Sequence, residues 1–130
     1  MPRQPSEYPT RLELEILKIL WDADELTVRT IRQRLSDAGR DSAHTSVITI
    51  LNIMVDKGYV AKRKDGKSYL FWAIVDEPNT MRAMLGDFVD RAFDGSPQLL
   101  VSNLLGDGNI EREELLELRK LINQTLKKRG

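Results

Sequence analysis

The segment AHTSVITILNIMVDKGY, residues 43–59, carries two kinds of side chain on opposite sides of one predicted helix. One side has apolar residues at the i, i+3, i+4 and i+7 spacing of a buried stripe. They are Val47, Ile50, Leu51 and Met54. The other side has Thr45, Thr49 and Asn52 rather than the Glu and Lys that usually face solvent. Because hydroxyl and carboxamide groups both donate and accept hydrogen bonds, this side has the chemistry of a recognition surface.

The rest of the sequence offers little reactive chemistry. It contains no cysteine, which excludes a disulfide framework, a thiolate metal site and a cysteine nucleophile. Its single histidine, His44, excludes most histidine-based metal or catalytic clusters. No nucleophile–base pair or phosphate-binding glycine loop is present. We therefore expect a protein that is not an enzyme and that uses no metal or other cofactor.

Composition and charge set broader limits. The chain has 130 residues, of which 41% are hydrophobic and 31% charged, a balance typical of a globular protein. Without a long apolar run or a basic-then-apolar start, we expect a cytoplasmic protein that is not inserted in a membrane. The net charge is zero, but the segment KRKDGK, residues 62–67, is strongly basic. By itself such a cluster is more often a solvated turn than a binding site.

Two helices are predicted ahead of residues 43–59. Thr10 and Glu13 have the spacing of a capping box, so a first helix is expected from about Arg11 to Trp21. Thr27 is expected to cap a second helix with a buried apolar stripe and outward-pointing arginines. The stripe consists of Val28, Ile31 and Leu35, and the arginines are Arg29, Arg32 and Arg34.

After the third helix, which Gly58 should end, the apolar period changes from 3.6 to 2. Residues 59–64 and 67–75 are rich in aromatic and β-branched residues and flank Asp65-Gly66, a strong signal for a tight hairpin turn. Three helices followed by a hairpin form the layout of a winged helix-turn-helix. In that layout the third helix lies in a DNA major groove and the hairpin is the wing.

This layout assigns roles to the two polar features. Small polar side chains can pair with base edges, and the predicted base-reading residues are Thr45, Ser46, Thr49 and Asn52. A wing beside the reading helix reaches the sugar-phosphate backbone. The predicted backbone contacts are Ser42, His44, Lys62, Arg63, Lys64 and Lys67. Ser42 or His44 is alternatively the cap of the third helix.

The segment Asp76-Glu77-Pro78-Asn79 predicts a boundary, because proline lacks a backbone donor and restricts the preceding residue. The expected fold is mainly α with a small β-hairpin: a winged helix-turn-helix domain at 8–76 and a helical dimerisation region at 77–130. The second region is too short to build a large core alone, yet its predicted helices are strongly apolar, so we expect a homodimer. The predicted dimerisation residues are Leu85, Phe88, Val89, Leu100, Leu104, Leu115, Leu118, Leu121 and Ile122.

Several segments resemble the penicillinase-repressor family of bacteria (BlaI/MecI/CopY type). The strongest are TSVITILNIMVDKGYV and EELLELRKLI, and the resemblance runs from about Tyr8 to Ile122. It implies a homodimer with an N-terminal winged helix-turn-helix, bound to a palindromic double-stranded DNA operator. The copper-responsive branch carries a C-terminal cysteine cluster, so the absence of cysteine points to the BlaI/MecI branch. Basic residues common on the family's third helix are replaced here by Ile48 and Ile53.

The resemblance also implies a release mechanism. In such a family a membrane-bound sensor protease pathway causes cleavage in the C-terminal region, in a response to β-lactams or cell-wall stress. By position relative to EELLELRKLI, Asn103-Leu104 corresponds to the Asn-Phe bond that is cut in characterised members. Leucine replaces phenylalanine here, and release by a ligand or by another protease is an alternative.

A winged-helix protein-interaction module is the main alternative function. It explains the predicted fold but leaves the Thr45, Thr49 and Asn52 face and the basic hairpin without a role. Sequence-specific binding to DNA would distinguish the two functions.

Overall fold

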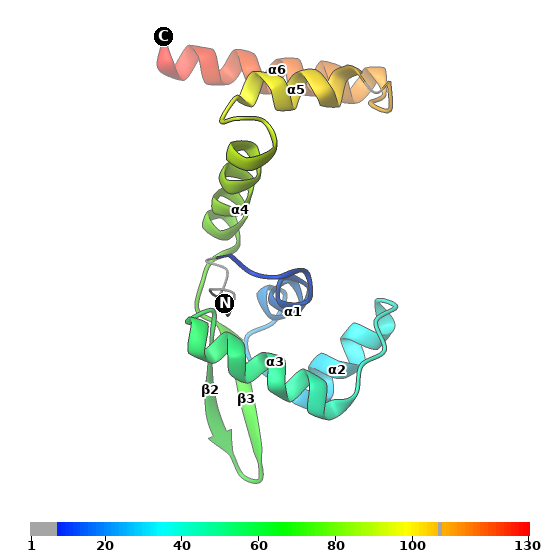
Figure 1. Cartoon of the computed structure of the whole chain (residues 1–130), viewed down its shortest axis with the longest axis vertical. Helices are drawn as coiled ribbons and strands as arrows, with labels where there is room; N and C mark the ends of the chain where they lie inside the picture. Colours follow the sequence, from blue (N-terminus) through cyan, green and yellow to red (C-terminus); the bar gives the residue numbers. More distant parts are fainter. Residues whose placement is uncertain (1–7, 107) are drawn as a thin grey trace, which may run out of the picture. The chain divides into compact units, whose positions relative to one another are not determined.

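The computed structural model describes residues 8–106 and 108–130. Its elements are α1 (Arg11–Trp21), β1 (Leu26–Thr27), α2 (Val28–Asp37), α3 (His44–Lys57), β2 (Val60–Asp65), β3 (Ser68–Ala73), α4 (Glu77–Ala92), α5 (Pro97–Gly106) and α6 (Arg112–Arg129) (Figure 1). The predicted class, mainly helical with a small sheet, is confirmed. Two compact units divide the chain, one ending at Leu85 and one running from Gly86 to Gly130. The domain boundary at Asp76 stays a prediction.

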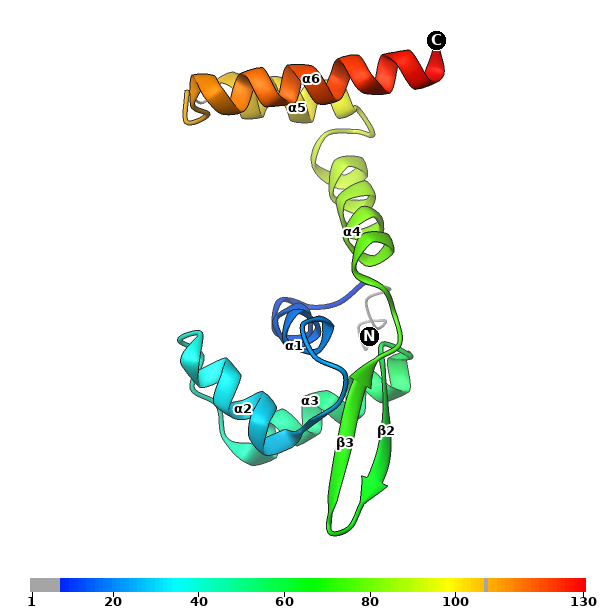
Figure 2. The ribbon, with the colours of Figure 1, turned by 180° about the vertical axis from the view of Figure 1, so that it is seen from behind.

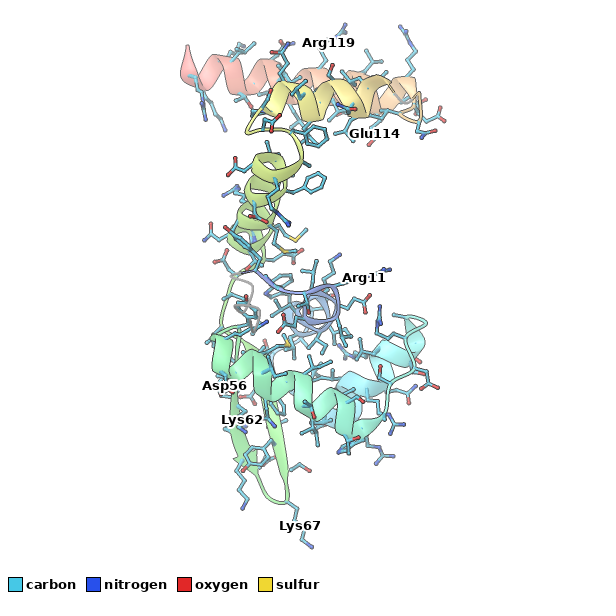
Figure 3. The ribbon with its side chains drawn as sticks, in the orientation of Figure 1. Arg11, Asp56, Lys62, Lys67, Glu114 and Arg119 are labelled. Atoms are coloured by element: carbon cyan, nitrogen blue, oxygen red, sulfur yellow. The ribbon has the colours of Figure 1, made fainter. Side chains whose placement is uncertain are left out.

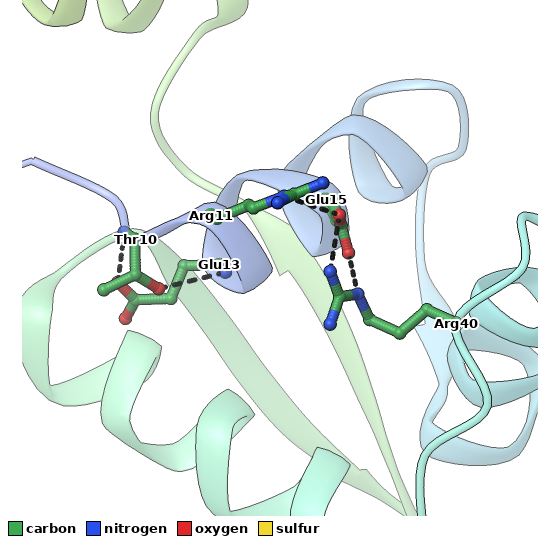
Figure 4. A network of polar contacts seen from close by, with 5 residues as sticks. All are labelled: Thr10, Arg11, Glu13, Glu15 and Arg40. Atoms are coloured by element: carbon green, nitrogen blue, oxygen red, sulfur yellow. Dashed lines mark hydrogen bonds and ion pairs between the residues drawn. The ribbon is translucent and has the colours of Figure 1, made fainter.

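The first helices begin where their capping residues predict. The Thr10 backbone N–H donates to the Glu13 carboxylate at 2.8 Å, and the Glu13 N–H donates to Thr10 Oγ1 at 3.3 Å (Figure 4). At the start of α2, Thr27 Oγ1 accepts a hydrogen bond from the Thr30 N–H at 3.2 Å. Each cap satisfies a backbone N–H that has no acceptor inside its helix.

The core of the first unit lies between α1, α2, α3 and the sheet. Its buried residues are Ile16, Leu17, Leu20, Val28, Ile31, Leu35, Val47, Leu51, Met54, Tyr59, Val60 and Phe71. Ile50, which the sequence assigned to the stripe of the third helix, is partly buried and packs against this core. The Trp21 indole N–H donates to the Val75 carbonyl at 2.8 Å, which ties the end of α1 to the segment after the hairpin.

The sheet has three antiparallel strands in the order β1-β3-β2. Figure 2 shows β2 and β3 side by side in the hairpin. β1 contains only Leu26 and Thr27, which pair with Phe71 and Leu70 of β3. The sequence analysis did not predict it, because a strand of this length shows no periodicity. Its pairing places the start of α2 next to the wing.

The hairpin turn lies one residue later than predicted. Asp65 pairs with Ser68, so the loop residues are Gly66 and Lys67 rather than Asp65 and Gly66. Gly66 has a φ of 62°, a left-handed value that glycine adopts without steric cost. The shift places Lys67 at the tip of the wing.

Local caps also start α4 and α5. The Asp76 carboxylate accepts a hydrogen bond from the Asn79 N–H at 3.0 Å in the first turn of α4. This bond and a second one from the Asn79 side chain keep the pKa of Asp76 below its usual value. Ser96 Oγ accepts a hydrogen bond from the Leu99 N–H at 3.2 Å and caps α5.

Candidate nucleic-acid interface

One side of α3 is exposed and polar. Thr45, Ser46 and Thr49 are exposed, whereas Val47 and Leu51 on the other side are buried. Thr49 Oγ1 donates to the Thr45 carbonyl at 2.8 Å. Its hydroxyl hydrogen is therefore used inside the helix, and its lone pairs and methyl group are what remains for another molecule.

The start of α3 differs from the prediction. Its N-cap is Ala43, which makes no side-chain capping bond, and His44 is the first helical residue. The Ser42 carbonyl accepts a hydrogen bond from Arg32 Nε at 2.7 Å. Neither Ser42 nor His44 caps the helix, because Arg32 holds the preceding backbone so that the helix begins after Ala43. His44 is exposed and Ser42 is half-buried at this end of α3.

The cations of the wing do not share one environment. Arg63 forms a bidentate pair with Glu25, with Nε–Oε1 and Nη2–Oε2 distances of 3.2 and 2.9 Å. The hydrogen bond from Arg63 keeps the pKa of the Glu25 carboxyl below its usual value. Lys64 and Lys67 make no hydrogen bond or ion pair with any described residue. Figure 3 shows Lys67 at the tip of the hairpin.

Lys62 lies closer to α3 and contacts it directly (Figure 3). Its Nζ donates to Asn52 Oδ1 at 2.9 Å. The same Nζ lies 5.0 Å from the centroid of the Tyr69 ring on β3. Lys62, a predicted contact to the DNA backbone, is thus hydrogen-bonded to Asn52, a predicted base-reading residue.

A groove of about 530 Å³ lies between α3, the wing and the start of α2. It brings together the predicted site residues His44, Asn52, Lys62 and Lys67. Thr45, Ser46, Thr49, Arg63 and Lys64 do not line it.

Arg29 also lines this groove and was missed, because the sequence analysis treated it as one of several outward-pointing arginines. Its position in the first turn of α2, two residues after the Thr27 cap, was the available signal. Ile48, which stands where basic residues are common in the resembled family, supplies an apolar part of the wall.

The C-terminal end of α3 is held by a buried ion pair. Lys57 Nζ lies 3.0 Å from both carboxylate oxygens of Glu13, a residue that is only 3% exposed. Lys57 also lies 5.9 Å from the centroid of the Tyr59 ring. Burial, and next the negative charge of Glu13, raises the pKa of Tyr59. The ion pair connects the last turn of α3 to the first turn of α1.

The connection before α3 is held by a second pair. Arg40, which lies between α2 and α3, forms a bidentate pair with Glu15 of α1 (Figure 4). Arg11 approaches the same carboxylate at 3.8 Å. The hydrogen bond from Arg40 keeps the pKa of Glu15 below its usual value. The last turn of α3 and the connection before it are thus both tied to α1.

The predicted dimerisation residues are mostly exposed in the single chain. The exposed ones are Leu85, Phe88, Leu104, Leu115, Leu121 and Ile122, and the half-buried ones are Leu100 and Leu118. Val89 differs, because its side chain is only 8% exposed and is already covered within the chain. The sequence analysis missed further exposed apolar residues, which are Leu99, Val101, Leu105, Leu116 and Leu126.

The predicted cleavage residues lie inside α5. Asn103 Nδ2 donates to the Leu99 carbonyl at 2.8 Å, and the Leu104 side chain is 54% exposed. The bond between them is therefore part of a hydrogen-bonded helix, close to its end at Gly106.

Comparison with known proteins agrees with this geometry. A profile of the family described as "Penicillinase repressor" matches residues 9–124, which is most of the chain. The chain belongs to the penicillinase repressor family. Membership classes this repressor with regulators of transcription and not with enzymes.

Named relatives support the assignment. The repressor is 24% identical over 112 residues to the penicillinase repressor of Bacillus licheniformis. The aligned residues cover 86% of this chain and 87% of the relative. It is 22% identical to the methicillin resistance regulatory protein MecI of Mammaliicoccus sciuri over 86% of this chain and 90% of the relative. The solved structure of RosR from H. salinarum has a TM-score of 0.51 and 15% identity, with coverage of 90% and 93%. That likeness shows the fold alone.

Residues 8–106 and 108–130 contain neither a membrane-spanning helix nor a candidate metal site. No helix in these ranges is both long and apolar enough to cross a membrane. Nor do these residues contain a group of His, Cys, Asp and Glu side chains suited to hold a metal ion.

Proposed function

We propose that the repressor is a homodimer that binds a palindromic operator through its two α3 helices and is released by cleavage in its C-terminal region. The observation that carries the DNA part is the exposed polar side of α3 beside a wing whose Lys64 and Lys67 side chains have no partner among the described residues. The names of the relatives, a penicillinase repressor and a methicillin resistance regulator, favour a β-lactam or cell-wall stress response.

In this proposal α3 lies in the major groove with Thr45, Ser46, Thr49 and Asn52 toward the bases. The methyl group of Thr49 suits a thymine methyl, since its hydroxyl hydrogen is bonded within the helix. The ion pairs of Glu13 and Glu15 hold α3 against the core. They limit its movement when it enters the groove.

The wing and the start of α3 would contact the backbone. Lys64 and Lys67 have no partner among the described residues and are free to replace counterions at phosphates. His44 and Arg29 line the groove beside the wing, and Ser42 lies two residues before His44, so we propose that these three contact a phosphate there. Arg63 is paired with Glu25, so we propose a weaker contribution from it than the sequence indicates.

Dimerisation would cover the apolar side chains that α5 and α6 expose. Two α3 helices in one dimer would address half-sites about one helical turn of DNA apart, or a multiple of it. A binding protein with two linked half-sites gains affinity from the effective concentration of the second contact.

Release is proposed to occur at the Asn103-Leu104 bond. Because the bond lies in a helix, a protease needs α5 to open locally before it can bind an extended strand. The nearby helix end at Gly106 and the exposed leucines of α5 favour such opening. Cleavage would separate α6 from the rest of the chain and lower operator affinity while α3 stays unchanged.

DNA binding is tested by measuring the affinity of the full-length protein for fragments of its own genome and for random duplexes across a salt series. We expect a subset of genomic fragments to bind at least about 1,000-fold more tightly than random DNA at equal salt. Equal affinity for all duplexes would favour the protein-interaction module instead. The Thr45→Ala/Thr49→Ala variant is the control, because it should lose preference and keep random binding.

Cleavage is tested by mass spectrometry of the protein from cells treated with a β-lactam. We expect fragments that meet at Asn103-Leu104, together with expression of the repressed genes. A Leu104→Pro variant, which removes the amide N–H at this bond, should resist cleavage. An intact chain alongside expressed target genes would show that release occurs by another route.

A further inference from the structure

Asn52 differs from the other predicted base-reading residues because its side chain already has a partner on the wing. Asn52 Oδ1 accepts a hydrogen bond from Lys62 Nζ at 2.9 Å. An ammonium group only donates hydrogen bonds, so the carboxamide must turn its oxygen toward Lys62 and its Nδ2 group away. The contact therefore decides which hydrogen-bonding atoms of Asn52 remain for another molecule.

Lys62 is held in this position from a second side. Its Nζ lies 5.0 Å from the centroid of the Tyr69 ring, where the ring's charge distribution attracts a cation. Lys62 pairs with Phe71 across the hairpin and Lys64 with Tyr69, so these four side chains share one face of the wing. Phe71 is buried in the core on that face. The Lys62 side chain thus reaches from the wing to α3, and its Nζ contacts the Tyr69 ring and the Asn52 carboxamide.

We infer that Lys62 is a positioning residue for base recognition: it orients Asn52 so that the Nδ2 donors, and not the oxygen, face the bases. This inference rests on the proposed function, because it requires α3 to lie in a major groove. Guanine offers such donors two acceptors, N7 and O6, and thymine offers O4, whereas adenine offers only N7 beside its own N6 donor. An asparagine free to use both atoms pairs instead with N6 and N7 of adenine. The wing then takes part in the choice of base as well as in binding phosphate.

The test selects binding sequences from a randomised duplex library with the full-length protein and with its Lys62→Met variant. Methionine keeps an unbranched apolar side chain beside Tyr69 but cannot donate to Asn52. We expect the wild-type protein to prefer guanine or thymine at one position of each half-site. The variant should shift that position toward adenine by about 10-fold in relative affinity, while other positions keep their preferences.

Lys64→Met is the matched control. It removes the same charge from the same face of the same strand, but Lys64 has no hydrogen bond to α3 among the described residues. It should weaken binding to all duplexes alike and flatten the salt dependence by about one unit, with no change in base preference. Comparing the two variants separates orientation of Asn52 from simple loss of charge.

Asn52→Ala supplies a second check. In the Asn52→Ala background, Lys62→Met should change no base preference, because the group that it orients is gone. Circular dichroism of each variant verifies that the fold is kept.

Two results would overturn the inference while leaving the proposed function in place. One is a Lys62→Met variant that behaves like Lys64→Met, since Lys62 would then only contact phosphate. The other is a change of base preference when Lys62→Met is introduced into the Asn52→Ala variant. If the wild-type protein itself selects no sequence, the proposed function fails and the inference fails with it.

Discussion

The two units of the repressor differ in how they cover their apolar side chains. The first unit buries residues from α1, α2, α3 and the sheet in one core. In the described part of the second unit, Val89 is the one buried residue, and many leucines of α5 and α6 are exposed. Large exposed apolar areas mark interaction surfaces in stable proteins. The contrast supports the proposal that the second unit pairs with a partner, whereas the first unit covers its apolar side chains within the chain.

The ion pairs among the described residues show the same contrast. In the first unit Glu13, Glu15 and Glu25 pair with residues on distant segments. In the second unit the pairs Asp87–Arg91 and Glu117–Lys120 lie within single helices. Pairs between segments hold elements in a defined arrangement, whereas pairs within a helix support that helix alone. In the first unit these pairs hold α1 to the last turn of α3 and to the connection before it, and the wing to the segment before β1.

The largest effect is expected from the core of the first unit. Leu51 on α3 is fully buried, so Leu51→Ala should lower the free energy of unfolding by about 2–5 kcal/mol. DNA binding should weaken strongly, because α3 loses the packing that positions it. Urea unfolding followed by circular dichroism measures the first effect.

Thr45→Ala, on the exposed side of the same helix, is its control. It should change the free energy of unfolding by less than about 0.5 kcal/mol while altering base preference. A Leu51→Ala variant as stable as the wild type would contradict the conclusion that the buried core stabilises the first unit.

The next largest effect concerns association. Leu121→Asp places a charge on an exposed apolar position of α6 and should raise the dimer dissociation constant by at least about 10-fold, since burial of one leucine contributes about 1.5–3 kcal/mol. Analytical sedimentation measures it. Asn123→Asp adds the same charge to the same turn at a polar, exposed position and should change association little. A wild-type protein that stays monomeric at micromolar concentration, both free and on DNA, would contradict the proposal that the second unit forms a dimer.

A smaller effect is expected from the wing. Lys64→Ala and Lys67→Ala should each weaken binding to every duplex and reduce the slope of log affinity against log salt by about one unit. The affinity is measured by fluorescence anisotropy across a salt series. Lys128→Ala, at the end of α6, removes the same charge from the second unit and should leave the slope unchanged. An equal change of slope for Lys128 would mean that DNA also contacts the second unit.

The smallest effect is expected from Glu25→Gln, which frees Arg63 from its pair. Binding at low salt should tighten, with a slope steeper by up to about one unit. Because the pKa of Glu25 is lowered in the folded state, the pair adds stability above the pKa of the unfolded chain. That stability is lost as the pH falls through the folded pKa, and Glu25→Gln should remove this part of the pH dependence of unfolding.

Asp24→Asn is the control, since it removes a neighbouring negative charge, whereas the partner of Arg63 is Glu25. An equal tightening by both variants would mean that a general loss of negative charge, and not the release of Arg63, is responsible.

The helices were predicted well because their signals are local. Thr10 with Glu13, Thr27 with Thr30, and Gly58 at its φ of 82° act within one turn of the helix that they begin or end. The capping prediction for Ser42 or His44 was wrong because a distant side chain, Arg32, holds the backbone there.

The sheet was predicted less completely because its pairing joins distant residues. β1 is defined by its bonds to Phe71 and Leu70, and neither Leu26 nor Thr27 shows this in its neighbours. The turn moved by one residue for the same reason, since cross-strand register and not the Asp65-Gly66 dipeptide decides which residues form the loop.

The sequence by itself determined which side of α3 is polar, where the helices begin, and that α5 and α6 carry more apolar surface than they bury. Those properties depend on residue type and on neighbours three or four positions apart. The tertiary structure alone decided which charged groups remain available: Arg63 is paired, Lys62 is bonded to Asn52, and Lys64 and Lys67 have no partner among the described residues. The reason is that an ion pair or a hydrogen bond depends on distance in space, and the partners of Arg63 and Lys62 lie far from them along the chain.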